Sequence, residues 1–198
     1  RDTSVTGVQT CALPISYLGI AGKIDDNDIK KEEITNAEII FLEGYLWDEG
    51  NPKKAFDKAI IHSKKVAMSL SDQFCVERHK PHFLDLVKNK IDIIFANEQE
   101  ILSLIEAKTF NEAVSFSKEL KKNIIITRGS KGAVSINDGH VEEVEAGSNL
   151  KIRDLTGAGD LFAAGYLHGI INNFKTKDCL MKGTELSSKV IQIIGSRI

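Results

Sequence analysis

The sequence predicts an α/β fold in which a mostly parallel sheet is covered by helices on both faces. Short apolar runs that suit buried strands alternate with segments whose apolar residues recur at helical spacing. The strands are far enough apart for the right-handed helical crossovers that join parallel strands. With 42% hydrophobic and 27% charged residues among 198, the composition is that of one globular domain.

The first two thirds of the chain supply this alternation. Apolar runs predict strands at 38–42, 66–70, 91–96 and 123–127. Asn51 as a cap and Pro52 in the first turn predict a helix that ends near Lys65. We expect a loop at 71–80, a short helix opened by Pro81, and two further helices at 98–105 and 111–121.

The last third begins with a different pattern. A turn at 128–132 precedes two strands, 133–137 and 140–144, and the Asp138-Gly139 pair between them is typical of a hairpin. These strands predict an antiparallel edge on the sheet. In the rest of the chain we expect a strand end, a glycine-rich turn, a helix at 157–171 and a second helix at 176–194.

Charge, hydropathy and cysteine content exclude several classes of protein. The net charge of −2 gives no positive field to hold a nucleic acid, and no apolar run approaches the roughly 20 residues that span a bilayer. Cys11, Cys75 and Cys179 are odd in number and widely spaced, which indicates neither disulfides nor a zinc site. We therefore expect a cytoplasmic protein with a small-molecule substrate and no nucleic-acid or membrane partner.

The two ends of the chain suggest that a longer protein has been cut. Residues 1–15 lack helical or strand periodicity and are similar to translated sequencing adaptor, so we expect a non-native leader there; a natural, poorly ordered terminus is the alternative. Residue 1 is Arg, and the chain stops just after Gly195 without a polar tail. We expect residues 16–198 to be the C-terminal part of a single domain.

The segment 154–165, DLTGAGDLFAAG, carries the clearest chemical signal. Gly157 and Gly159 allow the backbone to turn so that several amides gather at a helix N-terminus, which attracts a phosphate. Asp160 lies in the first helical turn, where it could accept a proton from an attacking hydroxyl. The alternative is that Asp160 only stabilises the helix and the glycines only make a turn. Phe162 stands where a dinucleotide-binding fingerprint needs its third glycine, and no P-loop motif occurs.

Three motifs in order resemble the ribokinase-like (PfkB) family of carbohydrate and adenosine kinases: the segments 95–100 (FANEQE), 127–133 (TRGSKGA) and 154–165. The stretches 43–48, 69–79 and 193–197 are most similar to the adenosine-kinase-like bacterial branch. The resemblance implies a three-layer α/β/α ribokinase-like fold that is incomplete at its N-terminus. The family's di-glycine motif, lid and most acceptor contacts have no counterpart here, and Leu155 replaces a usual threonine.

The resemblance also implies roles for individual residues. Asp160 would be the catalytic base, and the amides of Gly157, Ala158 and Gly159 would form the anion hole. Nucleotide-binding positions would be Thr127, Gly129, Gly132 and Thr156. Asn97 and Glu100 would act on Mg²⁺ through water, although a helix cap and a solvated acid are the alternative from the residues alone. Asp154, together with Thr156, matches positions that line a monovalent-cation site, such as one for K⁺, in some members.

The activity implied is ATP-dependent phosphorylation of a hydroxyl of adenosine or a sugar, with ATP and Mg²⁺ as cofactors. Another sugar kinase of the family is the alternative, namely a ribokinase, a fructokinase or a 2-keto-3-deoxygluconate kinase. A nucleotide-binding fragment without activity is the third possibility, and we expect the 198-residue chain itself to be inactive. Missing strands would expose a sheet edge, so we also expect it to be poorly soluble.

Overall fold

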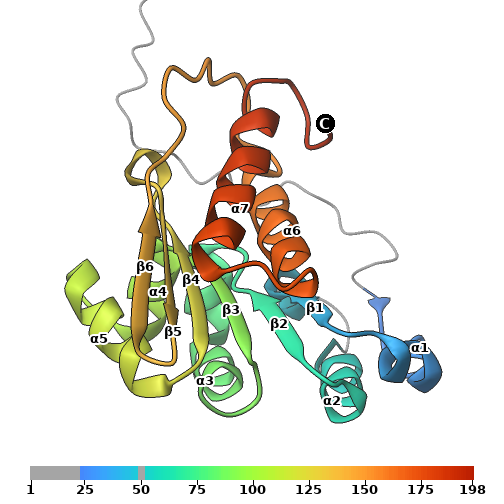
Figure 1. The fold of residues 1–198 in the computed structure, drawn as a ribbon. Coiled ribbons are helices and arrows are strands. Elements are labelled where there is room, and N and C mark those ends of the chain that lie inside the picture. Colours follow the sequence, from blue (N-terminus) through green and yellow to red (C-terminus); the bar gives the residue numbers. More distant parts are fainter. Residues whose placement is uncertain (1–22, 49–51) are drawn as a thin grey trace, which may run out of the picture.

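The computed structural model describes residues 23–48 and 52–198, which form a six-stranded sheet with the strand order β1-β2-β3-β4-β5-β6 (Figure 1). The first four strands are parallel, and the last two are antiparallel. The strands are β1 (Ile40–Glu43), β2 (Val66–Ser69), β3 (Ile93–Asn97), β4 (Asn123–Thr127), β5 (Ala133–Asn137) and β6 (His140–Val144). The predicted parallel sheet with an antiparallel edge is confirmed. The expected leader 1–15 and the cap Asn51 lie outside the described residues.

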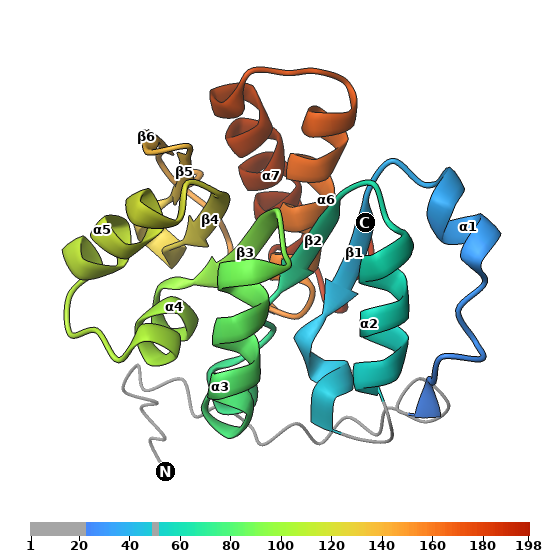
Figure 2. The ribbon, with the colours of Figure 1, turned by 90° about the horizontal axis from the view of Figure 1, so that it is seen from below.

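Helices lie on both faces of this sheet, as predicted. The helices are α1 (Lys31–Asn36), α2 (Pro52–His62), α3 (Gln73–Asn89), α4 (Glu98–Ile105), α5 (Phe110–Leu120), α6 (Ala158–Ile171) and α7 (Thr176–Val190). Short 3₁₀ turns occur at Gly44–Asp48 and Gly129–Lys131. Figure 2 shows α6 and α7 on one face of the sheet and α2 to α5 on the other. The result is a three-layer α/β/α arrangement.

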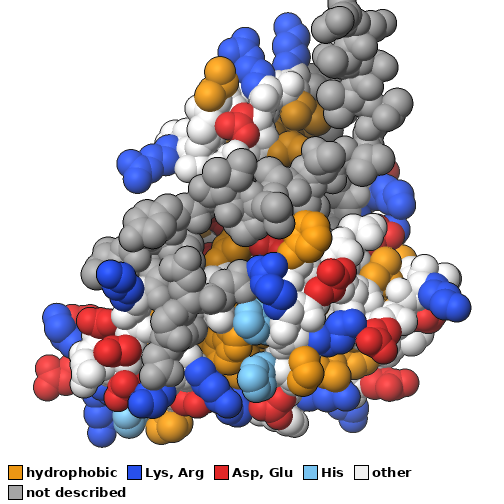
Figure 3. All heavy atoms as spheres, turned by 180° about the vertical axis from the view of Figure 1, so that it is seen from behind, with side chains coloured by type: hydrophobic (Ala, Val, Ile, Leu, Met, Phe, Trp, Pro, Cys, Tyr) orange, Lys and Arg blue, Asp and Glu red, His pale blue; other side chains and the backbone are white. Residues whose placement is uncertain are grey.

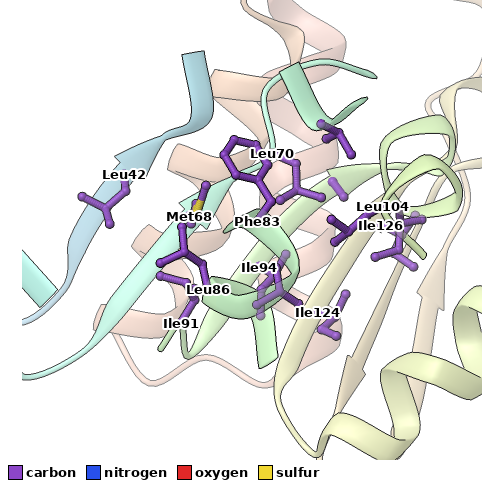
Figure 4. Packing of buried hydrophobic residues seen from close by; sticks show 14 of the residues in the cluster. Leu42, Met68, Leu70, Phe83, Leu86, Ile91, Ile94, Leu104, Ile124 and Ile126 are labelled. Carbon is purple, nitrogen blue, oxygen red and sulfur yellow. The ribbon is translucent and has the colours of Figure 1, made fainter. Parts of the chain in front are cut away.

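Alternate residues of the central strands enter two separate cores. Met68, Ile94 and Ile124 pack with Phe83 of α3 in the core under α2 to α5 (Figure 4). Their neighbours Ala67, Ile93, Phe95 and Ile125 pack instead with the helices α6 and α7. Because side chains on a strand point alternately to opposite faces, a strand buried on both faces must be apolar throughout. This requirement explains the continuous apolar runs in the sequence.

Helix α3 begins earlier than the sequence predicts. The expected loop at 71–80 is wrong, because Asp72 accepts a hydrogen bond from the Cys75 amide at 2.8 Å and caps a helix that starts at Gln73. Pro81 lies inside this helix instead of opening it. The chain kinks just before it, at His79 (φ −117°, ψ 18°). A proline interrupts the hydrogen-bond ladder but does not prevent a capped helix from forming upstream of it.

The C-terminal helix is shorter than predicted, and no strand precedes the glycine-rich turn among the described residues. Helix α7 ends at Val190 rather than at 194, and residues 145–157 form no strand. The carbonyl oxygen of Ile191 accepts hydrogen bonds from the amides of Arg153 (2.8 Å) and Asp154 (3.3 Å). The segment before the turn is therefore held against the end of α7 and not against a strand.

A buried polar cluster fixes helix α6 on the sheet. The Tyr166 hydroxyl of α6 donates to Asn123 Oδ1 of β4 at 3.2 Å, and Ser135 Oγ of β5 donates to the same oxygen at 3.1 Å. The two hydroxyl oxygens of Tyr166 and Ser135 are 3.0 Å apart. Each of these polar groups is buried but has a partner, which removes most of the cost of burying it.

Helices α6 and α7 approach each other closely through glycines. A Cβ atom added at Gly165 would lie 2.7 Å from the Lys182 carbonyl oxygen and 2.9 Å from the Gly183 Cα. A Cβ added at Gly183 would in turn lie 2.8 Å from the Phe162 carbonyl oxygen. Only residues without a side chain allow the two backbones this separation. The helix that carries Asp160 is thereby held tightly against α7.

The outer surface is mixed in charge where the described residues can be seen. In Figure 3, Lys and Arg side chains alternate with Asp and Glu side chains over the face seen from behind. Within residues 23–48 and 52–198, no helix has both the length and the apolar character needed to cross a membrane. Strand β1 forms one edge of the sheet, and no described strand pairs with its outer side. The predicted poor solubility stays a prediction.

Candidate active site

The glycine-rich turn ends in the N-terminus of α6. Gly157 adopts the left-handed conformation (φ 79°, ψ 3°) and precedes the first helical residue, Ala158. The Ala158 amide donates to the Leu155 carbonyl at 3.2 Å, and the Leu161 amide donates to that of Gly157 at 2.9 Å. Within the described part of the chain, the amides of Gly159 and Asp160 donate to no backbone carbonyl. Both residues are exposed, so an anion could approach these two donors from solvent.

Asp154 holds this turn to the C-terminal segment. One of its carboxylate oxygens accepts hydrogen bonds from the Thr156 amide (2.9 Å) and hydroxyl (2.7 Å), and the other accepts one from the Gly195 amide (2.9 Å). These hydrogen bonds, the one from the Thr156 amide first, lower the pKa of Asp154. A Cβ at Gly157 would lie 2.8 Å from Ser196 Cβ. The end of the chain therefore packs directly on the turn.

A second carboxylate shares a cavity with Asp160. Glu43 at the end of β1, Tyr45 and Leu46 in the turn after it, and Asp160 line a cavity of about 220 Å³. The Tyr45 amide donates to Ser71 Oγ at 3.2 Å, and the Tyr45 hydroxyl donates to the Ser71 carbonyl at 2.9 Å. Ser71 has a left-handed backbone (φ 74°), which is strained for a residue with a Cβ. Tyr45, in the wall of the cavity, is thus held in place by its hydrogen bonds to the strained Ser71.

Burial and the neighbouring Asp160 carboxylate raise the pKa of Glu43 to about 7, although a hydrogen bond from the Ser71 hydroxyl opposes them. The ordinary value is 4.5, so between these two values the folded protein retains a proton that the unfolded chain releases. The free energy of unfolding should therefore fall as the pH rises through this window. Burial also raises the pKa of the Tyr45 hydroxyl.

We expect Glu43→Gln to reduce this pH dependence. Glutamine resembles the protonated acid, so the variant should lose about 1 kcal/mol less stability than the unchanged protein between pH 5 and pH 8, allowing for solvent near a half-buried group. Urea denaturation at several pH values measures this difference. Equal slopes for the two proteins would contradict the assignment of the raised pKa to Glu43.

Asn97 and Glu100 form a reciprocal cap at the start of α4. The Glu100 amide donates to Asn97 Oδ1 at 2.8 Å, and the Asn97 amide and side-chain Nδ2 donate to the two Glu100 carboxylate oxygens at 2.9 and 2.6 Å. Glu100 is 4% exposed, and this burial raises its pKa to about 7 while the hydrogen bonds from Asn97 lower it. The charges of Asp72 and Glu43 raise it further, so Glu100 belongs to the same acidic region as the cavity. The expected cap at Asn97 is present, but the expected solvated acid is wrong, because Glu100 is buried.

The segment 127–132 makes a tight turn between β4 and β5. Thr127 ends β4, and its hydroxyl donates to the Ala96 carbonyl at 3.5 Å. Gly129 and Gly132 have left-handed φ values of 57° and 84°. A Cβ at Gly132 would lie 1.9 Å from the Val144 carbonyl oxygen, so only glycine fits there. This close contact places the turn directly against the end of β6.

A larger cavity, of about 380 Å³, begins at that end of β6. Its lining residues come from the segment after β6 and from α7: Val144, Glu145, Ala146, Gly147, Met181, Thr184, Glu185, Ser188, Lys189 and Gln192. Thr184 Oγ1 is buried and has no hydrogen-bond partner among the described residues. No motif in the sequence predicts this cavity.

The structure thus brings part of the predicted site together. The charge of Asp160 raises the pKa of Glu43, and the charge of Glu43 raises the pKa of Glu100. The glycine-rich turn and the start of α4 therefore both lie near the cavity that Glu43 lines. Sequence reasoning missed Glu43 and Tyr45, although the stretch 43–48 that contains them had been noted for its resemblance. Of the predicted residues in the turn 127–132, Gly132 lies against Val144, which lines the larger cavity.

Comparisons with known proteins agree with this architecture. The family model described as "pfkB family carbohydrate kinase" matches residues 15–198. The chain is 32% identical over 182 residues to the cytidine kinase of Thermococcus kodakarensis, covering 88% of this chain and 62% of that protein. It is also 25% identical over 205 residues to the adenosine kinase of Schizophyllum commune, covering 91% of this chain and 59% of that one.

Solved structures give the same result. The adenosine kinase from Sinorhizobium meliloti superposes with a TM-score of 0.86 at 32% identity, covering 89% of this chain and 56% of that one. A probable sugar kinase from Rhizobium etli superposes with a TM-score of 0.83 at 36% identity, covering 88% and 54%. The chain spans about three fifths of the length of the curated relatives it matches. On its motifs, fold and relatives, the chain belongs to the pfkB family of carbohydrate kinases.

Proposed function

We propose that the complete gene product is an ATP-dependent kinase that transfers phosphate to a hydroxyl of a nucleoside or a sugar, with adenosine as the leading acceptor. The observation that carries the proposal is that Asp160 lines a cavity and also lies beside the accessible amides at the start of α6. A base and an anion site next to each other are what phosphoryl transfer to a hydroxyl requires. The names of the related adenosine and cytidine kinases support a nucleoside acceptor.

In this mechanism, the acceptor hydroxyl enters the cavity and gives its proton to the Asp160 carboxylate. The turn formed by Gly157, Ala158 and Gly159 directs amides, above all those of Gly159 and Asp160, at the phosphoryl group, where they stabilise its charge. Glu43 and Tyr45 line the same cavity and would contact the acceptor. The left-handed Gly157 aims these groups, because it sets the direction in which α6 begins.

The acidic region between β1 and α4 fits Mg²⁺ held mainly through water. Among residues 23–48 and 52–198, no three His, Cys, Asp or Glu side chains are placed to hold a metal ion by themselves. Both Glu100 carboxylate oxygens already accept hydrogen bonds from Asn97. Mg²⁺ commonly keeps several waters and binds through few protein ligands and substrate phosphates, so Asn97 and Glu100 would contact its waters. When bound, the ion would neutralise charge on the nucleotide phosphates.

The nucleotide would lie along the turn between β4 and β5. Thr127, Gly129 and Gly132 would contact it, and Thr156 would reach it from the glycine-rich turn. We place the base in the 380 Å³ cavity, because Gly132 lies against Val144 at one end of that cavity. Open space beside Gly129 leaves room for a ligand to approach the backbone.

The Asp154 carboxylate lies at the contact between the glycine-rich turn and Gly195, and its negative charge would suit a monovalent cation such as K⁺ there. We place the activity in the cytoplasm, where ATP is available, with neither nucleic acid nor membrane as a partner. The mixed surface charge and the net charge of −2 support that choice.

A coupled assay for ADP tests this function in the complete gene product, with ATP, Mg²⁺ and a panel of adenosine, cytidine, ribose, fructose and 2-keto-3-deoxygluconate. We expect turnover on adenosine. Turnover on a sugar alone would move the protein to the sugar kinases. No ADP formation with any acceptor, combined with measurable ATP binding, would indicate a nucleotide-binding protein without activity. The 198-residue chain, assayed in parallel, is expected to be inactive.

A further inference from the structure

The side chain of Arg128 links three separate segments. Arg128 follows β4, and its backbone amide donates to the Gly132 carbonyl at 2.8 Å, which closes the turn. Its Nε donates to Glu98 Oε2 at 3.0 Å, and its guanidinium carbon lies 3.7 Å from the centre of the Phe110 ring. A guanidinium that pairs with a carboxylate and stacks on an aromatic ring is held in one position.

The partners of Arg128 lie at the starts of two helices. Glu98 is the first residue of α4 and directly follows Asn97, and Phe110 is the first residue of α5. The side chains of Arg128 and Glu98 are only 19% and 20% exposed, so water screens their interaction less than that of a surface pair. One side chain therefore connects the turn between β4 and β5 to the end of α4 where Asn97 and Glu100 lie.

The turn does not need this side chain to form. Backbone hydrogen bonds from Lys131 to Arg128 and from Gly132 to Gly129, both 3.1 Å, already shape it. Lys131 adds a second positive charge, but its Nζ is 4.0 Å from the same Glu98 oxygen and its side chain is 64% exposed. What the Arg128 side chain adds is the position of the turn relative to α4.

We propose that Arg128 is a positioning residue that holds the nucleotide-binding turn and the N-terminus of α4 at a fixed separation. Phosphates of a nucleotide bound along the turn then meet the Asn97 and Glu100 end of α4 in the geometry needed for transfer. This inference rests on the proposed function. It predicts that loss of the side chain impairs turnover and the response to Mg²⁺ more than it impairs nucleotide binding.

The test compares kcat, the KM for ATP and the Mg²⁺ concentration for half-maximal rate in the complete gene product. Arg128→Met should lower kcat about tenfold, raise the Mg²⁺ requirement and change the KM for ATP less than about threefold, because small displacements at a reacting centre are costly. The kcat and the Mg²⁺ requirement of Arg128→Lys should lie between those of the unchanged protein and Arg128→Met, since lysine keeps the charge but cannot stack as a planar group on Phe110. Combining Arg128→Met with Glu98→Gln should cost no more than Arg128→Met alone.

Lys80→Met is the matched control. It removes the 3.0 Å ion pair with Glu106 at the opposite end of α4, away from the turn, and should leave kcat and the Mg²⁺ requirement unchanged. The proposal is overturned if Arg128→Met leaves both quantities unchanged, if Lys80→Met lowers them equally, or if the losses of Arg128→Met and Glu98→Gln simply add.

A second readout separates this proposal from the proposed function. In the unchanged protein, Mg²⁺ with ATP should slow amide hydrogen exchange at the start of α4 as well as in the turn, and Arg128→Met should abolish only the protection of α4. A protein that binds Mg²⁺ and ATP without turnover refutes the proposed function, and the exchange experiment then decides the role of Arg128. A protein that binds no nucleotide overturns both.

Discussion

Replacing Asp160 by asparagine in the complete gene product is expected to lower kcat by about 10³-fold, the scale of a lost general base. Asparagine has nearly the same shape but cannot take the proton of the attacking hydroxyl. The accessible amides of Gly159 and Asp160 belong to the backbone and survive the change, so the affinity for ATP should stay within about twofold. The coupled ADP assay measures the first quantity, and calorimetric titration of ATP measures the second.

Asp178 provides the matched control for this experiment. It is also an exposed carboxylate in the first turn of a helix, α7, but it lines neither cavity. If Asp160 acted only by stabilising a helix N-terminus, Asp160→Asn and Asp178→Asn should have similar, small effects. Normal turnover of Asp160→Asn would remove Asp160 from the mechanism.

Introducing valine at Gly165 is expected to lower the free energy of unfolding of the 198-residue chain by about 3 kcal/mol, at the upper end for overpacking. The new Cβ would lie 2.7 Å from the Lys182 carbonyl oxygen and 2.9 Å from the Gly183 Cα. Both are backbone atoms and cannot rotate away as a side-chain tip could. The two helices must therefore separate, and the packing of Phe162 and Tyr166 on the sheet loosens with them.

Ala164→Val, at the preceding position of the same helix, controls for the helix propensity of valine. Ala164 is exposed, so the change there should cost only the difference in helix propensity, about 0.5 kcal/mol. Urea denaturation followed by circular dichroism gives both values. At Gly165 propensity alone predicts no loss, because glycine is a poorer helix former than valine. A loss at Gly165 no larger than that of Ala164→Val would therefore contradict the importance of the close approach of α6 and α7.

Regular elements with strong local signals could be predicted closely. Strands β4 and β6 and helix α4 have the predicted bounds, because β-branched runs and the Asn97 cap are local features. The first part of helix α3 was missed because Pro81, nine residues after the cap at Asp72, suggested that the helix starts there. The end of α7 depends on Arg153, far away in the chain, and no local pattern could reveal that contact.

The candidate site divides in the same way. Asp160 and the glycines around it stand in one short motif and were identified from the sequence. Glu43 looked like the polar end of a buried strand, and its relation to Asp160 exists only because the carboxyl end of β1 comes to lie near the start of α6. The cavity lined by Thr184 also joins distant segments. Sites made from several elements follow from the topology of the sheet, which no single motif encodes.

The hydrogen-bonded cluster of Tyr166, Ser135 and Asn123 determines the position of α6 along the sheet. An apolar helix can slide or rotate over an apolar sheet at little cost in free energy, because hydrophobic contacts are non-directional and one replaces another. Here any shift of α6 would leave the buried polar groups of Tyr166, Ser135 and Asn123 without hydrogen-bond partners. Since Asp160 stands six positions before Tyr166 on the same helix, these hydrogen bonds also determine where the Asp160 carboxylate lies in its cavity. Changes at these three positions should therefore be tolerated only together.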